Sequence, residues 1–159
     1  MTTKNTDLVA NFEASPQVAN NAAELAGVLR TAHGSVELAA GDSTDNDIVM
    51  LAPIPSNAAV PQLFVGADEL GGSCQYNVGI YTTAGVVKDE DVFATAVDVP
   101  AALADLRFEE ANIDTSRKKM WELAGDTTDP GGYFYIAVTF SATGGTAGTM
   151  AWNISYVVD

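Results

Sequence analysis

Hydrophobic and polar residues alternate most clearly at the end of the chain, between Thr146 and Asp159. One parity of this stretch carries large apolar side chains: Met150, Trp152, Ile154, Tyr156 and Val158. The other parity carries small or polar residues: Thr149, Ala151, Asn153 and Ser155. Successive side chains of a β-strand point to opposite faces, so this segment is predicted to be a strand with one apolar face. Such a face needs a second sheet to cover it.

The same alternation predicts further strands upstream. It occurs at Cys74, Tyr76, Val78 and Ile80 and again at Phe134, Ile136, Val138 and Phe140. Residues 82–85 are predicted to form the hairpin turn that leads into Val86 and Val87. Shorter apolar runs predict strands at 48–51 and 63–65, and a strand pair or one bent strand over 28–39. We expect Pro53 and Pro55 to end the strand at 48–51, because proline cannot donate to a ladder.

Helical patterns are few. Pro100–Arg107 is predicted to be a helix, and Ser116–Gly125 a second, shorter one. In the polar, Ala/Asn-rich start, Ser15–Gly27 reads either as a short helix with Ser15 as its N-cap or as part of an extended arm. We therefore predict an N-terminal arm over residues 1–26 and a β-sandwich domain over residues 27–159. The expected fold is mainly β: a two-sheet antiparallel sandwich, jelly-roll-like, of seven or eight short strands with one or two short helices.

The arm is predicted to lie against a neighbouring subunit rather than to fold alone. Its candidate anchors are the apolar residues Val9, Phe12, Val18 and Leu25, which are too sparse to form a core. Buried in a partner's pockets, each would contribute roughly 1.5–3 kcal/mol before the entropy of ordering is subtracted.

The charge balance excludes several partners. The 159-residue chain has 21 acidic and 7 basic residues and a formal net charge of −14. A nucleic-acid partner or an anionic membrane surface would require basic residues, so neither is expected. The polar start, Met1 to Asn5, lacks the apolar stretch of a signal peptide, and no run approaches the roughly 20 apolar residues that span a bilayer. We expect synthesis in a cytoplasm.

Catalytic chemistry is not indicated. His33 is the single histidine and Cys74 the single cysteine, which are too few for a metal site of the usual kind or for a disulfide framework. No nucleophile elbow, phosphate-binding loop or HExxH motif occurs. We therefore predict no enzyme activity, no cofactor, and no catalytic or metal-binding residues. His33 and Cys74 are interpreted as structural residues.

Two acidic clusters leave alternatives open. Asp42–Asp47 and Asp89–Asp91 each offer three carboxylates, and calcium prefers such oxygen ligands. The first cluster lacks the glycine and the distal glutamate of an EF-hand loop, and both clusters are typical of solvated loops. A carboxylate pair for glycoside hydrolysis stays open, because the separation of the carboxylates is invisible in a sequence. Trp121 and Trp152 offer a sugar-stacking platform as an alternative to a place in the core.

Taken as a whole, the chain resembles the capsid decoration, or cement, proteins of tailed bacteriophages. The resemblance covers most of the length after the arm. It is carried by the following phrases: Gly41-Asp42 before Ile48–Leu51, Ile54–Ala58, Val78–Tyr81, Asp91–Ala94, Arg117–Leu123 with Gly125, Asp129-Pro130, and Gly148-Thr149. These phrases contain no catalytic residues.

The resemblance implies a jelly-roll module, commonly a homotrimer, that binds the major capsid protein on the exterior of the virion after synthesis in the host cytoplasm. The alternative is a receptor- or glycan-binding module of a phage fibre or spike, for which exposed Trp121 or Tyr133 would be the first candidates. A carbohydrate-active enzyme on the same fold is a further alternative.

Overall fold

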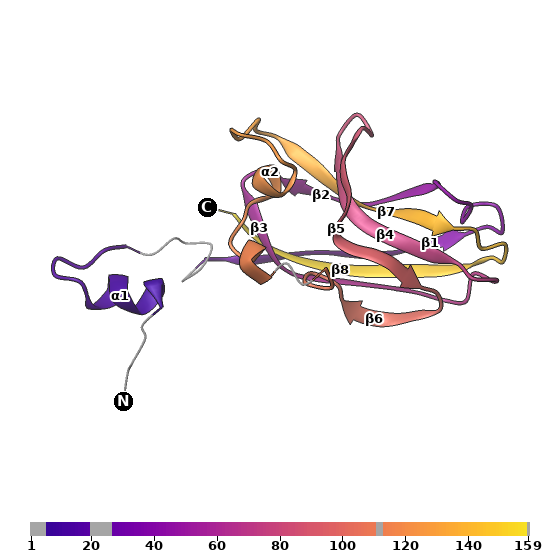
Figure 1. Ribbon diagram of the computed structural model, residues 1–159, viewed down its shortest axis with the longest axis horizontal. Helices are drawn as coiled ribbons and strands as arrows, with labels where there is room; N and C mark the ends of the chain where they lie inside the picture. Colours follow the sequence, from indigo (N-terminus) through magenta and orange to yellow (C-terminus); the bar gives the residue numbers. More distant parts are fainter. Residues whose placement is uncertain (1–5, 20–26, 111–112, 159) are drawn as a thin grey trace.

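The structure is a computed structural model, and it describes residues 6–19, 27–110 and 113–158. Figure 1 shows two β-sheets stacked face to face, with a short N-terminal helix standing apart from them. The helical elements are α1 (Asp7–Glu13), the 3₁₀ turn η1 (Ile113–Thr115) and α2 (Met120–Leu123). The strands are β1 (Leu29–Leu38), β2 (Ile48–Pro55), β3 (Ala58–Ala67), β4 (Gln75–Thr82), β5 (Val87–Asp98), β6 (Ala101–Asp105), β7 (Tyr133–Ala142) and β8 (Gly148–Val158).

The strand order defines a jelly roll. One sheet has the order β1-β8-β3-β6 and is called sheet A below; the other has the order β2-β7-β4-β5 and is called sheet B. All neighbouring strands are antiparallel, and consecutive strands β1 to β4 alternate between the sheets. Eight strands arranged in this way form the double-sheet jelly roll. The predicted mainly β, two-sheet antiparallel sandwich is confirmed.

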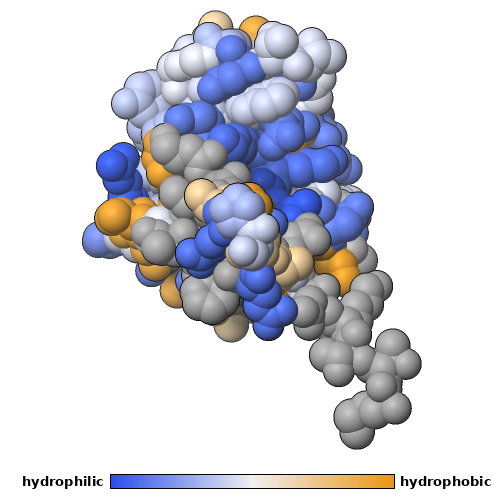
Figure 2. Space-filling view, turned by 90° about the vertical axis from the view of Figure 1, so that its left-hand side faces the viewer, coloured by the Kyte–Doolittle hydropathy of each residue, from blue (hydrophilic) through white to orange (hydrophobic). Residues whose placement is uncertain are grey.

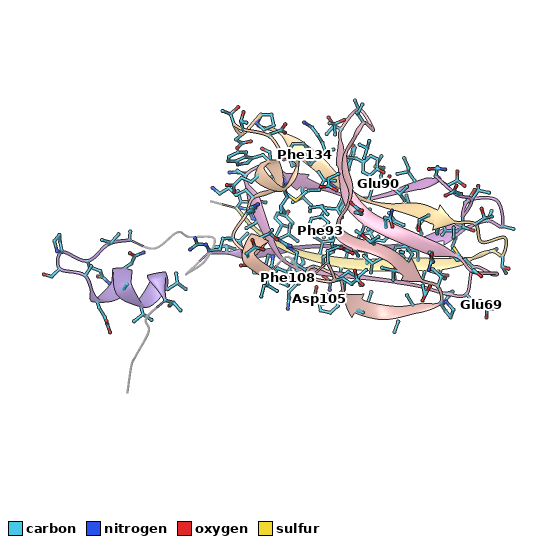
Figure 3. The ribbon with its side chains drawn as sticks, viewed as in Figure 1. Glu69, Glu90, Phe93, Asp105, Phe108 and Phe134 are labelled. Atoms are coloured by element: carbon cyan, nitrogen blue, oxygen red, sulfur yellow. The ribbon has the colours of Figure 1, made fainter. Side chains whose placement is uncertain are left out.

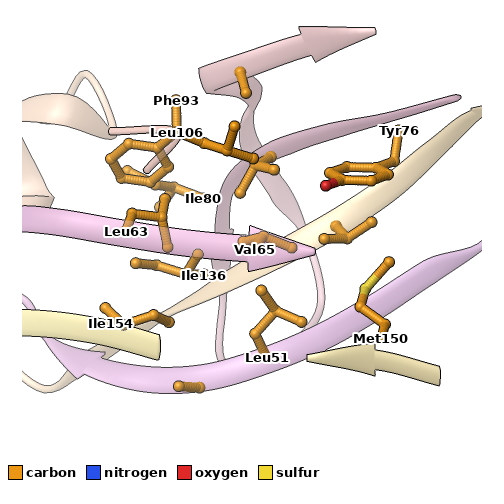
Figure 4. Packing of buried hydrophobic residues seen from close by; sticks show 14 of the residues in the cluster. Leu51, Leu63, Val65, Tyr76, Ile80, Phe93, Leu106, Ile136, Met150 and Ile154 are labelled. Carbon is orange, nitrogen blue, oxygen red and sulfur yellow. The ribbon is translucent and has the colours of Figure 1, made fainter. Parts of the chain in front are cut away.

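The core lies between the sheets and is built from the alternating residues. Figure 4 shows Leu63, Val65, Ile136, Met150 and Ile154 packed together there. Met150 and Ile154 are fully buried, whereas Trp152 and Tyr156 are partly buried and pack against the core. Trp152 lies directly opposite Gly34 of β1, and a Cβ at Gly34 would come within 2.8 Å of the indole ring. The predicted inward face of the last strand is therefore correct, although Trp152 lies towards the margin of the core.

The predicted helix over Pro100–Arg107 is wrong. Residues Ala101–Asp105 form the edge strand β6, which pairs with Phe64–Ala67 of β3. A Cβ on Gly66 would approach the backbone nitrogen of Leu103 to 2.7 Å, so the two strands lie unusually close at this point. Local helix propensity was overridden by this long-range pairing, as a weak intrinsic preference often is.

The other predicted helices also need correction. The second one is shorter than expected: α2 covers only Met120–Leu123 of the range Ser116–Gly125. In the arm, the helix is α1, and Ser15 and Pro16 follow it instead of starting it. Residues 20–26 of the helix predicted over Ser15–Gly27 lie outside the described residues.

The predicted end of the strand at 48–51 is wrong as well. Strand β2 continues through Pro53 and Pro55, which pair with Tyr135 and Tyr133 of β7 after a register shift between Met50 and Ala52. Strand β2 is at the edge of sheet B, where a missing N–H costs no ladder bond. The segment 28–39, which had two interpretations, is one continuous strand, β1.

Candidate interaction surfaces

The N-terminal arm exposes apolar side chains. Helix α1 has seven residues and no side-chain cap at Thr6. Figure 1 shows it away from both sheets, and none of its described side chains belongs to the core. Val9 is 41% exposed, and Val18, further along the arm, is 51% exposed. An isolated helix this short is marginal in water, so α1 needs a contact surface to be stable.

Of the four predicted anchors, two can be located. Val9 lies on α1, and Val18 lies after it with its N–H donating to the carbonyl of Asn11 at 3.1 Å. The backbone of Phe12 belongs to α1, but its side chain and the whole of Leu25 lie outside the described residues. The role of these residues as anchors stays a prediction.

The arm joins the sandwich at one end, called the arm-proximal end here. It is formed by residues 27–30, 55–59, 113–133 and 157–158. Three backbone pairs bring these segments together: Leu29 with Val157, Ala58 with Val158, and Ala59 with Lys119. Large apolar side chains are exposed on it: Val28 at 72%, Leu29 at 56%, Ile113 at 73% and Tyr133 at 56%. Figure 2 looks at this end and shows hydrophobic side chains beside hydrophilic ones around the arm.

Charges at the arm-proximal end are mixed. Its basic residues are Arg30, Arg117, Lys118 and Lys119. The acidic residues Asp114, Glu122, Asp126 and Asp129 lie among them. The pKa of Asp129 is lowered by hydrogen bonds from the Ser56 side chain and the Gly131 N–H, and by the charge of Lys119. The end is therefore not an acidic surface, in spite of the net charge of the chain.

The opposite end, called the distal end, is formed by the loops 39–47, 68–74 and 143–147. Two of their carboxylates accept local hydrogen bonds: Asp42 accepts from the N–H of Ala39 at 2.9 Å, and Asp47 accepts from the N–H of Thr44 at 2.9 Å and from its hydroxyl. These bonds from Thr44 lower the pKa of Asp47. The predicted calcium alternative gains no support, since no group of three or more metal-ligating side chains occurs in the described part of the chain.

The outer face of sheet B carries an apolar row. Pro53, Tyr135, Tyr81 and Val87 lie opposite one another on β2, β7, β4 and β5. Tyr81 is buried on this face and its hydroxyl bonds Thr139, whereas Val87 is 50% exposed. The backbone of β5 bends over the face, so that a Cβ on Gly79 would meet the Asp89 carbonyl oxygen at 2.1 Å. Tyr133 and Lys88 line a depression of about 280 Å³ beside this row.

Arg107 is a buried cation that the sequence patterns did not identify. Its side chain is 1% exposed. Nε donates to the Val60 carbonyl at 2.7 Å, and the guanidinium also donates to the carbonyl of Thr115 at 2.8 Å. The guanidinium lies over the rings of Phe93 and Phe108, at 5.3 and 4.7 Å from their centroids. Burial lowers the pKa of Arg107 to about 10. These contacts tie the segment after β6 to β3, which is a structural role.

The residues considered for chemistry do not converge. His33 is exposed on the outer face of β1, and Cys74 is buried, with a thiol pKa raised by that burial. Trp121 packs against the core from α2. In the second acidic cluster, burial and then the neighbouring Asp91 raise the pKa of Asp89. Figure 3 places Glu69 at the distal end and Glu90 on β5, well apart from each other.

Comparisons with known proteins show the fold and no more. Neither a family model nor a curated protein matches the chain. A chain in the structure of the capsid of Ralstonia phage GP4 superposes with a TM-score of 0.53 and 19% identity, over 84% of this chain and 86% of that one. Chains of the cyanophage Pam1 capsid asymmetric unit (TM-score 0.47, 15% identity, 84% and 86% covered) and of the acidic stable capsid of Helicobacter pylori bacteriophage KHP30 (0.37, 9%, 82% and 94%) are more distant. The protein thus shares its jelly roll with a chain of a phage capsid structure.

In the ranges that are described, no helix is long and apolar enough to cross a bilayer.

Proposed function

We propose that this protein is a structural component of a bacteriophage virion that binds the outer surface of the capsid shell and stabilises it. The observation that carries the proposal is an arm with exposed Val9 and Val18 beside a jelly roll that is already complete. An arm whose described side chains lie outside the core of the sandwich is suited to a neighbouring subunit. The similarity of the sandwich to a chain of the GP4 capsid structure supports the proposal.

The partner in this proposal is the major capsid protein, and the arm is the main anchor. A stable interface buries on the order of 800 Å² per partner. A 159-residue sandwich with a protruding arm can supply that area without loss of its core. The net charge of −14 keeps the unbound protein soluble until it meets the shell. The proposal requires no catalytic step and no cofactor.

Removal of the arm tests this function. A variant lacking residues 2–26 and the full-length protein are each mixed with shells that lack this protein, and the bound fraction is measured by co-sedimentation. Full-length protein is expected to bind. The shortened protein is expected to keep its β circular dichroism spectrum and to bind at least about tenfold more weakly, which corresponds to about 1.4 kcal/mol. Equal binding by the two forms would refute the anchoring role of the arm, and no binding by the full-length form would refute the function.

We also propose that the protein forms a homotrimer through packing contacts rather than through ion pairs. With 21 acidic and 7 basic residues, charged surfaces of two copies repel each other. The apolar row on sheet B, with Val87 50% exposed, offers an uncharged contact area. Light scattering at micromolar concentration and moderate salt should give three times the mass of one chain. A monomer under these conditions would contradict the trimer.

One observation favours the alternative function, a receptor- or glycan-binding module. Tyr133 is 56% exposed and lines the depression of about 280 Å³ together with the ion pair formed by Lys88 and Asp126, whose atoms are 2.7 Å apart. An aromatic face beside charged groups suits a sugar. Retention on a glycan array that is lost in Tyr133→Ala would support this alternative, and absence of retention would leave the shell-binding function as the better account.

A further inference from the structure

The two ends of the sandwich differ in charge. The distal loops carry Asp42, Asp45, Asp47, Asp68 and Glu69, and they contain no lysine or arginine. The arm-proximal end holds the basic residues Arg30, Arg117, Lys118 and Lys119 together with an equal number of acidic residues. Four of these five distal carboxylates are on exposed residues, and Asp47 is partly buried. An acidic partner surface would be repelled by the distal end and tolerated by the arm-proximal end.

The two ends also differ in their exposed apolar surface. The distal loops expose no large hydrophobic side chain, because Leu70 and Cys74 are turned inward at 0% and 1% exposure. The arm-proximal end exposes Val28, Leu29, Ile113 and Tyr133, each by more than half. Single exposed apolar residues are ordinary, but their gathering at one end, beside an arm that also exposes Val9 and Val18, is typical of an interaction surface.

From these differences we infer that the arm-proximal end of the sandwich is itself a docking surface, which binds the capsid shell beside the arm while the distal end points away from it. The inference rests on the proposed function and names the part of the sandwich that serves it. The fitting partner surface has recesses for the aliphatic side chains of Val28, Leu29 and Ile113. It also has carboxylates or carbonyl oxygens opposite Lys118.

Two leucines of equal exposure provide a matched test. Leu29 on β1 is 56% exposed at the arm-proximal end, and Leu103 on β6 is 55% exposed beside Gly66, away from that end. Each is an edge-strand residue, so Leu29→Asp and Leu103→Asp add the same charge at similar cost to the fold. The full-length variants are titrated against shells that lack this protein, and binding is measured by co-sedimentation. Thermal unfolding of each variant is measured in parallel.

We expect Leu29→Asp to weaken binding at least about tenfold and Leu103→Asp to change it by less than about twofold. Equal binding by the two variants would overturn the inference while the arm remains an anchor. Failure of the unsubstituted protein to bind would overturn the proposed function instead. If Leu29→Asp lowers the unfolding temperature, Ile113→Asp decides the question, because Ile113 is 73% exposed in a short 3₁₀ turn.

A charge exchange adds an independent measurement. Lys118→Glu at the arm-proximal end and Glu69→Lys at the distal end each change an exposed residue by two charges. We expect Lys118→Glu to weaken shell binding, most strongly at low salt, and Glu69→Lys to leave it unchanged or slightly improved. A larger loss with Glu69→Lys would mean that the distal end meets the shell, and it would overturn the inferred orientation.

Discussion

The distal and arm-proximal ends of the sandwich show two ways of ending a jelly roll. At the distal end the loops are joined by backbone hydrogen bonds. The N–H of Gly144 donates to the Ser43 carbonyl at 2.8 Å, and the Leu70 carbonyl accepts from the N–H groups of Gly145 and Thr146, both at 2.8 Å. Leu70 itself is fully buried. At the arm-proximal end Leu29 is 56% exposed. The first end is complete within the chain, whereas the second leaves apolar surface that a partner can cover.

The largest expected difference in the free energy of unfolding is between two leucine-to-alanine variants, one at each end. Leu70→Ala removes a fully buried side chain and should lower the free energy of unfolding by about 2–5 kcal/mol. Leu29→Ala removes an exposed side chain and should change it by less than about 0.5 kcal/mol. Urea unfolding followed by fluorescence gives both values. Similar losses would show that the two ends do not differ in packing.

Two glycines of the distal end, Gly144 and Gly41, test how closely its loops are packed. A Cβ on Gly144 would lie 2.5 Å from the Ser43 hydroxyl oxygen and 2.6 Å from the Leu70 carbonyl oxygen, so Gly144→Ala forces the loops apart. We expect a loss of about 1–3 kcal/mol. Gly41 has no atom within 4 Å of its built Cβ, so Gly41→Ala should be neutral or slightly stabilising. A neutral Gly144→Ala in thermal unfolding would contradict the close packing of these loops.

Acidification should loosen the distal end through Asp47. Hydrogen bonds from Thr44 lower the pKa of this carboxyl in the folded protein. A lowered folded-state pKa stabilises the fold above the ordinary pKa of aspartate, and this stabilisation is lost as the pH falls below about 4. Asp47→Asn should therefore be less stable than the parent at neutral pH, and the difference should shrink on acidification. A difference that stays constant between neutral and acidic pH would refute this assignment.

The smallest effect concerns access to the distal core. Cys74 is 1% exposed, and burial raises its thiol pKa. At about pH 8 the folded protein should react with a thiol reagent far more slowly than the protein in urea, because the thiolate is the reactive form. Rapid labelling of the native protein would show that the distal end opens readily. Leu70→Ala removes a buried side chain from the same distal loop as Cys74, so it should speed the reaction of the thiol.

Alternation along the chain was sufficient to predict the strands that build the core. Met150 and Ile154 on β8, and Phe134 and Ile136 on β7, lie inside the sandwich as their parity predicted. Alternation is a local consequence of one buried face, so a sequence displays it directly. The hairpin at residues 82–87 was predicted as well, and its closure by the Thr82 N–H to the Val86 carbonyl is seen at 2.8 Å.

The errors arose where distant pairing decided the outcome. Ala101–Asp105 has helix-forming residues, but it pairs with β3, which lies more than thirty residues earlier. Pro53 is tolerated because β2 is an edge strand, a position that depends on the whole topology. Arg107 looked like the end of a helix and became a buried cation because Val60 and Thr115 supply carbonyl acceptors. None of these partners is recognisable from local sequence.

The candidate surface was predicted only in part. The arm was selected from the sequence because it lacks alternation; Val9 and Val18 on it are exposed, and their role as anchors stays a prediction. The exposed apolar residues of the arm-proximal end, such as Leu29 and Ile113, were not identified from the sequence. A sequence does not show which apolar residues of a strand or loop remain uncovered. Fractional exposure in the folded chain was needed to find them.

An electron cryomicroscopy reconstruction of decorated shells tests the central claim most directly. We expect density for the jelly roll on the outside of the shell, with Leu29 and Ile113 facing the capsid subunits and the arm running along them. The loops that carry Asp45 and Glu69 should face solvent. Density with these loops against the shell, or no density outside the shell at saturating protein, would contradict the account.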